Sequence, residues 1–371
     1  MKELQLIIIT LLVAACSQQK ETQIQEYVFN KDFAIENKVT DLFSDVTYTP
    51  LETTDDNLIG FNPQLYVSPS GIFIFDQQHT KRVLRFNNNG GFENFVGNIG
   101  DGPEEYKMPT AFFVNQPAKE IIISAAPSGM LYHYDQDGTF RKKECLDKSI
   151  VSFTLGNNNK YWIYTGGNVV SDKDRLLLFN GTQKEQGFFP VISQRAPSNQ
   201  QCFSNSPICA FQESFNDSIY HISGDRLHLK YKLNFGSLQI PQPVRDGANE
   251  NFGKYLSQNP YIAMFRFLEN NNFIYAGLVE NDGVELKGLY HWIIDKRSDK
   301  QSLVKMDMDN ALFMGLQYPL QLTENDELIF LMNSPFFDGI NKKENTVFYK
   351  ESQNPEISEN PVLTVCKLKQ L

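Results

Sequence analysis

The sequence predicts an all-β protein, a six-bladed β-propeller with four-stranded antiparallel blades. Three observations support this prediction. Aromatic residues make up 13% of the 371 residues, and Phe and Tyr favour strands and fill the flat layers between sheets. Short apolar runs recur at intervals of 40 to 58 residues. Turns rich in Asn, Asp and Gly follow several of these runs, and such turns are typical of antiparallel hairpins.

The recurring runs are apolar at successive positions rather than at alternate ones, which is typical of strands covered on both faces. Sheets stacked face to face around an axis provide that cover. Six repeated units are present, and each is expected to form one blade. The runs begin at Ile72, Ile121, Tyr161, Ile219, Phe273 and Leu328.

The hairpins within a unit are clearest in the first two units. Residues 83–86 lead through the turn at 87–90 into a second apolar stretch at 92–96. Residues 131–134 lead in the same way into the turn at 135–138. Both turns end in Asn-Gly or Asp-Gly, which supplies the positive φ angles of tight hairpin turns. Each unit therefore consists of hairpins in series, as a propeller blade does.

The two ends of the repeat region are expected to close the ring. Residues 45–51 form a predicted strand before the first complete unit, and residues 362–368 form one after the last unit. Pairing of these strands in one blade would remove an open sheet edge. The propeller is therefore assigned to residues 41–371, with one short helix expected at 249–256 in an insertion.

The chain begins with an export signal, which we assign to residues 1–15. Residues 6–15 are almost wholly apolar, too short to span a bilayer but suited to a signal peptide. The stretch ends in Val13-Ala14-Ala15-Cys16, which resembles the lipobox of bacterial lipoproteins. That resemblance implies cleavage before Cys16 and attachment of lipid to its thiol. An ordinary cleaved signal with a chance cysteine is the alternative.

Residues 16–40 are then a lipidated cysteine and a tether. Ser17 after the cysteine resembles the sorting signal for the outer membrane, so we expect an outer-membrane lipoprotein that faces the periplasm or the cell surface. A net charge of −10 argues against nucleic-acid binding and against direct binding to anionic lipid. The membrane would be contacted through the lipid anchor only, and we expect a monomer.

Four further cysteines follow Cys16. Cys202 and Cys209 lie in one polar loop, and export into an oxidising space permits a disulfide between them. Cys145 and Cys366 lie in predicted strands and are expected to be buried thiols. A zinc or thioredoxin-type site is not predicted, because the sequence contains no Cys-x-x-Cys motif.

Three stretches resemble the six-bladed β-propeller lipoproteins of Bacteroidetes, which are relatives of NHL-type propellers. The resemblance implies the fold and export, but it implies no established activity. It extends over nearly the whole chain, and Glu104 stands where members of that family often carry Gly. The three stretches are residues 41–60, residues 100–106 and residues 216–236.

The most distinctive stretch is the loop at residues 100–106. Its acidic side chains could bind a cation or ligand, and its glycines allow a close backbone approach. Alternatively it is a structural turn between blades, with its tyrosine packed and its second glutamate capping backbone amides. The candidate residues are Gly100, Asp101, Gly102, Pro103, Glu105 and Tyr106.

The remaining candidate sites rest on weaker patterns. Asp217-Ser218-Ile219 matches the simple acceptor pattern for O-glycosylation in Bacteroidetes, which makes Ser218 a candidate. The five histidines form neither His-x-His nor His-Glu-x-x-His. No Gly-x-Ser-x-Gly elbow is present, so a hydrolase serine of the α/β type is not predicted.

Two functions from different classes remain open. The anchor, the repeated blades and the lack of a catalytic motif favour a binding or scaffold module at the cell envelope, without a cofactor. Its partner would be a glycan, a peptide or another envelope protein. The alternative is a propeller hydrolase or lyase that holds Ca²⁺ at the mouth of the central channel, since relatives by fold bind calcium there.

Overall fold

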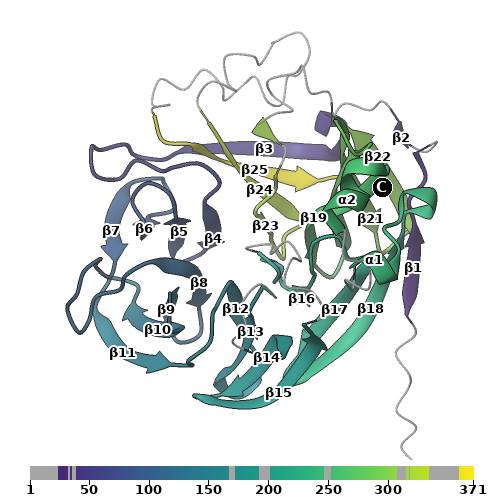
Figure 1. The fold of residues 1–371 in the computed structure, drawn as a ribbon. Helices are drawn as coiled ribbons and strands as arrows, with labels where there is room; N and C mark the ends of the chain where they lie inside the picture. Colours follow the sequence, from purple (N-terminus) through teal and green to yellow (C-terminus); the bar gives the residue numbers. More distant parts are fainter. Residues whose placement is uncertain are drawn as a thin grey trace, which may run out of the picture.

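The structure, a computed structural model, consists of six sheets arranged around a central axis (Figure 1). The six-bladed β-propeller predicted from the sequence is therefore confirmed. The first strands of the blades surround the centre of the ring (Figure 1). The structure describes residues 24–31, 34–35, 39–166, 172–191, 201–245, 252–306, 315–316, 318–333 and 359–371.

Blades 1 to 3 are built from strands that are consecutive in the chain and antiparallel throughout. Blade 1 contains β4 (Gln64–Ser68), β5 (Gly71–Asp76), β6 (Arg82–Phe86) and β7 (Phe92–Val96). Blade 2 contains β8 (Pro109–Asn115), β9 (Glu120–Ala125), β10 (Met130–Asp135) and β11 (Phe140–Cys145). Blade 3 contains β12 (Ser152–Leu155), β13 (Lys160–Tyr164), β14 (Asp174–Asn180) and β15 (Gln183–Pro190).

Blades 4 and 5 each gain an outer strand from the N-terminal segment. Blade 4 contains β16 (Ala210–Phe211), β17 (Ser218–Ser223), β18 (Arg226–Asn234) and β1 (Gln25–Val28), which pairs parallel to β18. Blade 5 contains β19 (Tyr261–Glu269), β20 (Phe273–Asn281), β21 (Leu286–Asp295), β22 (Lys300–Lys305) and β2 (Ala34–Ile35), which pairs parallel to β22.

Part of the segment assigned to a tether is thus built into the ring. The physical reason is aromatic packing between blades 4 and 5. Tyr27 and Phe29 are buried, and their rings lie 6.4 and 6.0 Å from the ring of Trp292. Burial of two aromatic side chains offsets the entropy lost when the segment is ordered.

Blade 6 closes the ring with strands from both ends of the chain. Val365 of β25 pairs with Thr47 of β3 in an antiparallel register, and the two strands lie side by side in Figure 1. This is the closure predicted from the sequence. Blade 6 contains β23 (Gln321–Leu322), β24 (Glu327–Met332), β25 (Val362–Leu368) and β3 (Phe43–Pro50).

Helical segments are short and lie between strands. The insertion between β18 and β19 carries α1 (Gln242–Arg245) and α2 (Phe252–Gln258), and the second agrees with the predicted helix at 249–256 to within a few residues. The 3₁₀ helices are η2 (Val39–Leu42), η3 (Asn157–Asn159) and η4 (Gly236–Leu238). No helix among the described residues is both long and apolar enough to span a bilayer.

The core lies between neighbouring blades. Every residue of β5 and β9 is buried, as the continuous apolar runs predict for strands covered on both faces. Between blades 1 and 2, Phe73 and Phe75 pack in one cluster with Tyr134. Each blade is therefore held mainly by apolar contact with its two neighbours.

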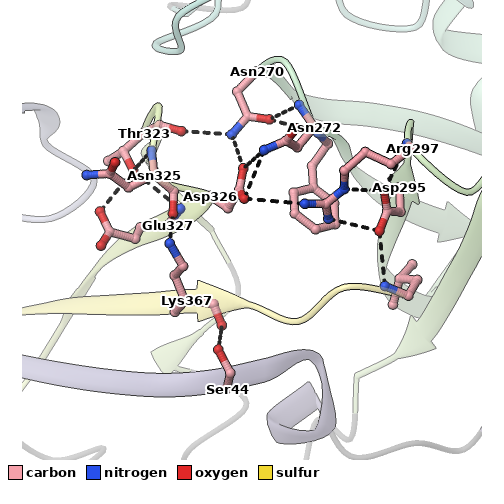
Figure 2. A network of polar contacts seen from close by, with 12 residues as sticks. Ser44, Asn270, Asn272, Asp295, Arg297, Thr323, Asn325, Asp326, Glu327 and Lys367 are labelled. Carbon is pink, nitrogen blue, oxygen red and sulfur yellow. Dashed lines mark hydrogen bonds and ion pairs between the residues drawn. The ribbon is translucent and has the colours of Figure 1, made fainter.

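A polar network joins the ends of blades 5 and 6 (Figure 2). The Asp326 carboxylate accepts hydrogen bonds from the side-chain amides of Asn270, at 2.8 Å, and Asn272, at 3.1 Å. Arg297 donates to both oxygens of Asp295, each at 2.9 Å. The backbone amide of Leu371 also donates to Asp295, at 3.1 Å, so the network fixes the C-terminus to blade 5.

Candidate functional site: the central cavity

A cavity of about 280 Å³ lies in the channel of the propeller, at the small end of the range for ligand pockets. Its walls are the first strands of blades 1 to 3, namely β4, β8 and β12, and the segment at residues 201–209. The walls combine aromatic rings with uncharged polar groups. Residues that represent both kinds are Gln64, Phe113, Ser152, Phe153, Gln201 and Phe203.

The segment at 201–209 enters the channel as a hairpin and crosses it. The Ser204 amide donates to Ala210 O at 2.8 Å, and the Gln212 amide donates to Cys202 O at 2.9 Å. The Asn205 side-chain amide donates to Leu65 O of blade 1 at 2.6 Å. It also donates to Leu320 O, beside blade 6, at 3.2 Å. Asn205 therefore fixes the hairpin to the neighbouring blades 1 and 6 at the wall of the cavity.

The register of this hairpin excludes the predicted disulfide. Cys202 lies opposite Gln212, and Cys209 lies at the turn beside Ala210, so the two cysteines are not cross-strand neighbours. Both are in the described part of the chain, and no disulfide joins them. The Cys209 thiol lies 3.9 Å from the Thr154 hydroxyl, and burial raises its pKa to about 11. It is a neutral thiol in the cavity wall.

Two polar atoms in the cavity wall lack a partner. Gln64 Nε2 and Ser152 Oγ are buried, and neither forms a hydrogen bond with any described residue. More than nine in ten buried polar groups in proteins are paired, and an unpaired one costs about 1–3 kcal/mol. None of the described residues that line the cavity is charged. The cavity is therefore lined by uncharged residues, two of which carry a buried hydrogen-bonding atom that is unused.

Arg266, on the inner strand of blade 5, lies beside this cavity. The pairing of β19 with β20 shifts between Met264 and Arg266, and such a bulge changes the direction in which a side chain points. The guanidinium donates from Nη1 to Oε1 of Gln201, a residue of the cavity wall. Its Nε is buried and has no partner among the described residues. Burial lowers the pKa of Arg266 to about 10, so the group remains charged at neutral pH.

Tyr275 and His291 lie next to Arg266 in the same blade. The Tyr275 hydroxyl and His291 Nδ1 are 2.9 Å apart. His291 Nε2 has no partner among the described residues, and burial lowers the pKa of this imidazole to about 4. His291 is therefore neutral at physiological pH, and it adds no positive charge beside Arg266.

The loop at 100–106 uses its own polar groups internally. The Gly102 amide donates to Glu105 Oε2 at 2.9 Å, and the Tyr106 hydroxyl, which is buried, donates to Val96 O at 3.1 Å. A Cβ at Gly100 would lie 1.8 Å from Glu105 Oε2, so a larger residue there would displace the Glu105 carboxylate. Asp101 forms an ion pair with Lys107. These contacts are compatible with a structural turn between blades. The loop does not line the central cavity but borders a separate pocket, and its role as a ligand or cation site stays a prediction.

Other predicted sites lie apart from the cavity. The Ser218 hydroxyl donates to Asp217 Oδ1 at 2.9 Å at the start of β17, and Ser218 is buried, so its glycosylation stays a prediction. Cys366 is buried, whereas Cys145 is exposed at the end of β11. Cys16 falls outside the described residues. The described part of the chain contains no group of three or more His, Cys, Asp or Glu arranged to hold a metal ion.

Comparison with known proteins supports the fold and the family. Residues 26–367 match the model of a family described as a domain of unknown function, DUF4934. The chain belongs to this family. No curated protein matches it. The DUF4934 chain resembles a solved Bacteroides fragilis protein described as exported, with a TM-score of 0.73 and 14% identity over 94% of this chain and 100% of that one.

A second solved structure is a member of the DUF4221 family from Bacteroides vulgatus. Its TM-score is 0.53 at 12% identity, over 89% of the DUF4934 chain and 98% of the other chain. At such low identity these likenesses concern the fold alone. They agree with the predicted resemblance to Bacteroidetes propellers, and the cavity of the DUF4934 chain has to be interpreted from its own residues.

Sequence reasoning did not find the residues of the cavity. Gln64, Ser152 and Arg266 belong to three different blades and to no motif. The only sequence signal is a lone arginine within the apolar run of β19, where Phe265 and Phe267 flank Arg266. A charged residue in an otherwise buried strand is unusual without a partner.

Proposed function

We propose that this protein is an exported binding module, anchored to the cell envelope through a lipidated Cys16, whose central cavity holds a small ligand. The observation that carries the proposal is the pair of unpartnered atoms, Gln64 Nε2 and Ser152 Oγ, in the wall of the cavity. A ligand with hydroxyl or carbonyl groups would satisfy both atoms once their side chains turn towards the cavity, and it would remove the cost of leaving them unpaired.

The shape of the site also supports binding. The cavity walls are strands of three blades, and each strand is fixed by its own ladder of backbone hydrogen bonds. The hairpin at residues 201–209 is held by hydrogen bonds from the Asn205 side chain to the carbonyl oxygens of Leu65 and Leu320. Because the site is rigid before the ligand arrives, little ordering entropy is lost when the ligand binds.

The composition of the wall favours binding over catalysis. General acid–base chemistry needs a titratable group near the reacting atom, and the described lining contains no Asp, Glu, His or Lys. Ser152 has no neighbouring base in the lining, and the raised pKa of Cys209 disfavours a reactive thiolate. Calcium prefers carboxylate ligands. The wall therefore lacks the groups that a Ca²⁺-dependent hydrolase or lyase would need at this position.

The position of β1 limits how far the propeller could lie from a lipid anchor. Eight residues separate Cys16 from Gln25, the first residue of β1. An extended chain spans at most about 3.6 Å per residue, so this linker would reach no more than about 30 Å. A propeller held this close to the membrane would meet ligands or partner proteins of the envelope.

The binding proposal is tested by native mass spectrometry of the protein purified from its own host. We expect the wild-type protein to carry a small-molecule adduct and the Ser152→Met variant, whose side chain fills the cavity, to lack it. Ser257→Met, on the exposed face of α2, is the matched control and should keep the adduct. Identical spectra for wild type and Ser152→Met would contradict the proposal.

The anchor is tested separately by labelling cells with palmitate. Wild-type protein should incorporate the label and fractionate with membranes, because two or more acyl chains anchor stably. Cys16→Ser should do neither. Membrane association without Cys16 would contradict the lipoprotein assignment and would leave the cavity proposal unaffected.

A further inference from the structure

We propose that the ligand of the central cavity is an acid, whose carboxylate or phosphate group pairs with Arg266 beside Gln201. This inference rests on the proposed function, because it names the chemistry of the ligand in the same cavity. It also explains a second anomaly of the site, which is a partly buried guanidinium that no described acidic side chain neutralises.

The first step of the argument is the cost of burying the charge. A buried ion is expensive unless a partner of opposite charge and further hydrogen bonds compensate it. Three other partly buried arginines of this protein follow that rule, whereas Arg82 lies over the ring of Phe95. Arg175 donates to Glu213 at 2.7 and 3.0 Å, and Arg245 donates to Asp217 at 2.8 Å. Arg85 lies 2.9 Å from Glu93.

Arg266 departs from this pattern. Its partner is a neutral amide oxygen of Gln201, and no acidic side chain of the described residues pairs with it. The buried Nε of Arg266 lacks a hydrogen bond, as do the Nε atoms of Arg85 and Arg245, so the missing carboxylate is the difference. The nearby Tyr275 hydroxyl is within hydrogen-bond distance of His291, and burial raises the pKa of Tyr275, so it remains uncharged. The charge of Arg266 is left for something that is not part of the described chain.

The second step is the position of the charge. Arg266 lies on β19, one of the strands that surround the channel (Figure 1). The residue that its guanidinium contacts, Gln201, is itself part of the cavity wall. Arg266 is not itself part of the cavity wall, so an acid bound in the cavity would reach the guanidinium by taking the place of the Gln201 side-chain oxygen.

The third step is the chemistry of the remaining wall. Arginine recognises carboxylate and phosphate oxygens through two parallel N–H donors. The rest of the ligand must be uncharged, because the described lining offers no second charge. Gln64 and Ser152 would bind hydroxyl or carbonyl groups, and Phe113 and Phe153 would cover an apolar face. The inferred class is a small acid with an uncharged polar body.

The test uses pairs of probes that differ only in charge. Glucuronate is compared with glucose, phenylacetate with phenylacetamide, and glucose 6-phosphate with glucose, by calorimetry on the full chain. We expect at least one acid to bind 100-fold or more tightly than its neutral partner. Arg266→Met should abolish that difference, and Arg266→Lys should restore part of it. Arg226→Met, at an exposed position of β18, is the control and should bind as wild type does.

Stability without ligand gives an independent readout. The melting temperature of Arg266→Met should equal or exceed that of the wild type, because the variant removes an uncompensated buried charge. A clear drop in melting temperature would show that the chain itself neutralises Arg266, and it would overturn the inference. So would acids that bind no more tightly than their neutral partners, or acid binding that Arg266→Met leaves unchanged.

The failure of this inference and the failure of the proposed function are distinguishable. If a neutral probe binds and Ser152→Met abolishes that binding, the cavity is a ligand site and only the acid assignment is wrong. If no probe binds and the native protein carries no adduct that Ser152→Met removes, both proposals are wrong.

Discussion

Two arginines of blade 5 differ in how many polar partners their guanidinium groups have. Arg297 donates to both oxygens of Asp295 and its guanidinium lies 4.6 Å from the centre of the Phe273 ring. Arg266 is partly buried beside the channel, with its Nε fully buried, and contacts one amide oxygen. The side chain of Arg297 is 36% exposed, so the arginine with more access to water also has more partners.

The comparison distinguishes polar groups that are paired within the chain from buried polar groups that lack a partner among the described residues. The network of Figure 2 satisfies its carboxylates with amides, a guanidinium and the C-terminal backbone. It needs nothing from outside the chain. The Arg266 side of the blade leaves Nε of the arginine and Nε2 of His291 unpaired among the described residues. Unsatisfied buried groups of this kind are candidates for ligand binding.

The largest expected effect is a dependence of stability on pH through His291. Its pKa is about 4 in the folded protein and 6.5 as the ordinary value. Below pH 6.5 the unfolded chain binds a proton that the folded chain does not, so the free energy of unfolding falls as the pH falls from 6.5 to 4. The full loss is about 3 kcal/mol at 1.36 kcal/mol per pH unit.

Urea unfolding between pH 5 and 7 measures the part of this loss that falls between pH 6.5 and 5, about 2 kcal/mol. Glu269, whose pKa is lowered in the folded protein by its hydrogen bonds and ion pairs despite burial, contributes mainly below this window. His291→Gln keeps a hydrogen-bonding group for Tyr275 and should flatten the profile between pH 5 and 6.5. A variant that retains the wild-type slope would show that His291 is not the titrating group.

The next effect concerns the centre of the satisfied network. Asp326→Ala removes the acceptor of the Asn270 and Asn272 amides, and it places alanine at a φ of 62°, which non-glycine residues rarely adopt. We expect a loss of about 3 kcal/mol in the free energy of unfolding. Asp326→Asn tolerates the same φ and keeps one acceptor oxygen, and it should lose less. Equal losses in the two variants would mean that the side-chain contacts contribute little.

The smallest effects come from the two arginines themselves. Arg297→Met leaves Asp295 without its charged partner, and because Arg297 is partly exposed we expect a loss of about 1–2 kcal/mol. Arg266→Met should change the free energy of unfolding by less than about 0.5 kcal/mol or increase it. Chemical denaturation of both variants at pH 7 compares them directly, and a larger loss for Arg266→Met would reverse the comparison.

The fold could be predicted because its signals are local. Each continuous apolar run, such as Ile72–Phe75 within β5, indicates a doubly covered strand by itself. Pairing of the two terminal strands follows because it removes an open sheet edge. β1 and β2 were not predicted as strands, because they are short and their stability comes from distant partners such as Trp292. The disulfide prediction failed because the spacing of Cys202 and Cys209 does not reveal the hairpin register that separates them.

The site could not be predicted for a related reason. In the sequence, Gln64 and Ser152 belong to no motif. They line one cavity only because the closed ring places β4 and β12 around the same channel. Conversely, the loop at Gly100 drew attention by its composition, yet its glycines and Glu105 serve its own turn. The residues with the most distinctive composition form contacts within their own loop, whereas the cavity is lined by residues that belong to no sequence motif.

A crystal structure of the protein with the tightest-binding acid tests the central claim most directly. The account predicts two anionic oxygens within hydrogen-bond distance of the Arg266 guanidinium, with the body of the acid against Gln64 and Ser152. An acid bound outside the channel, or an Arg266 paired with a carboxylate of the chain itself, would contradict it.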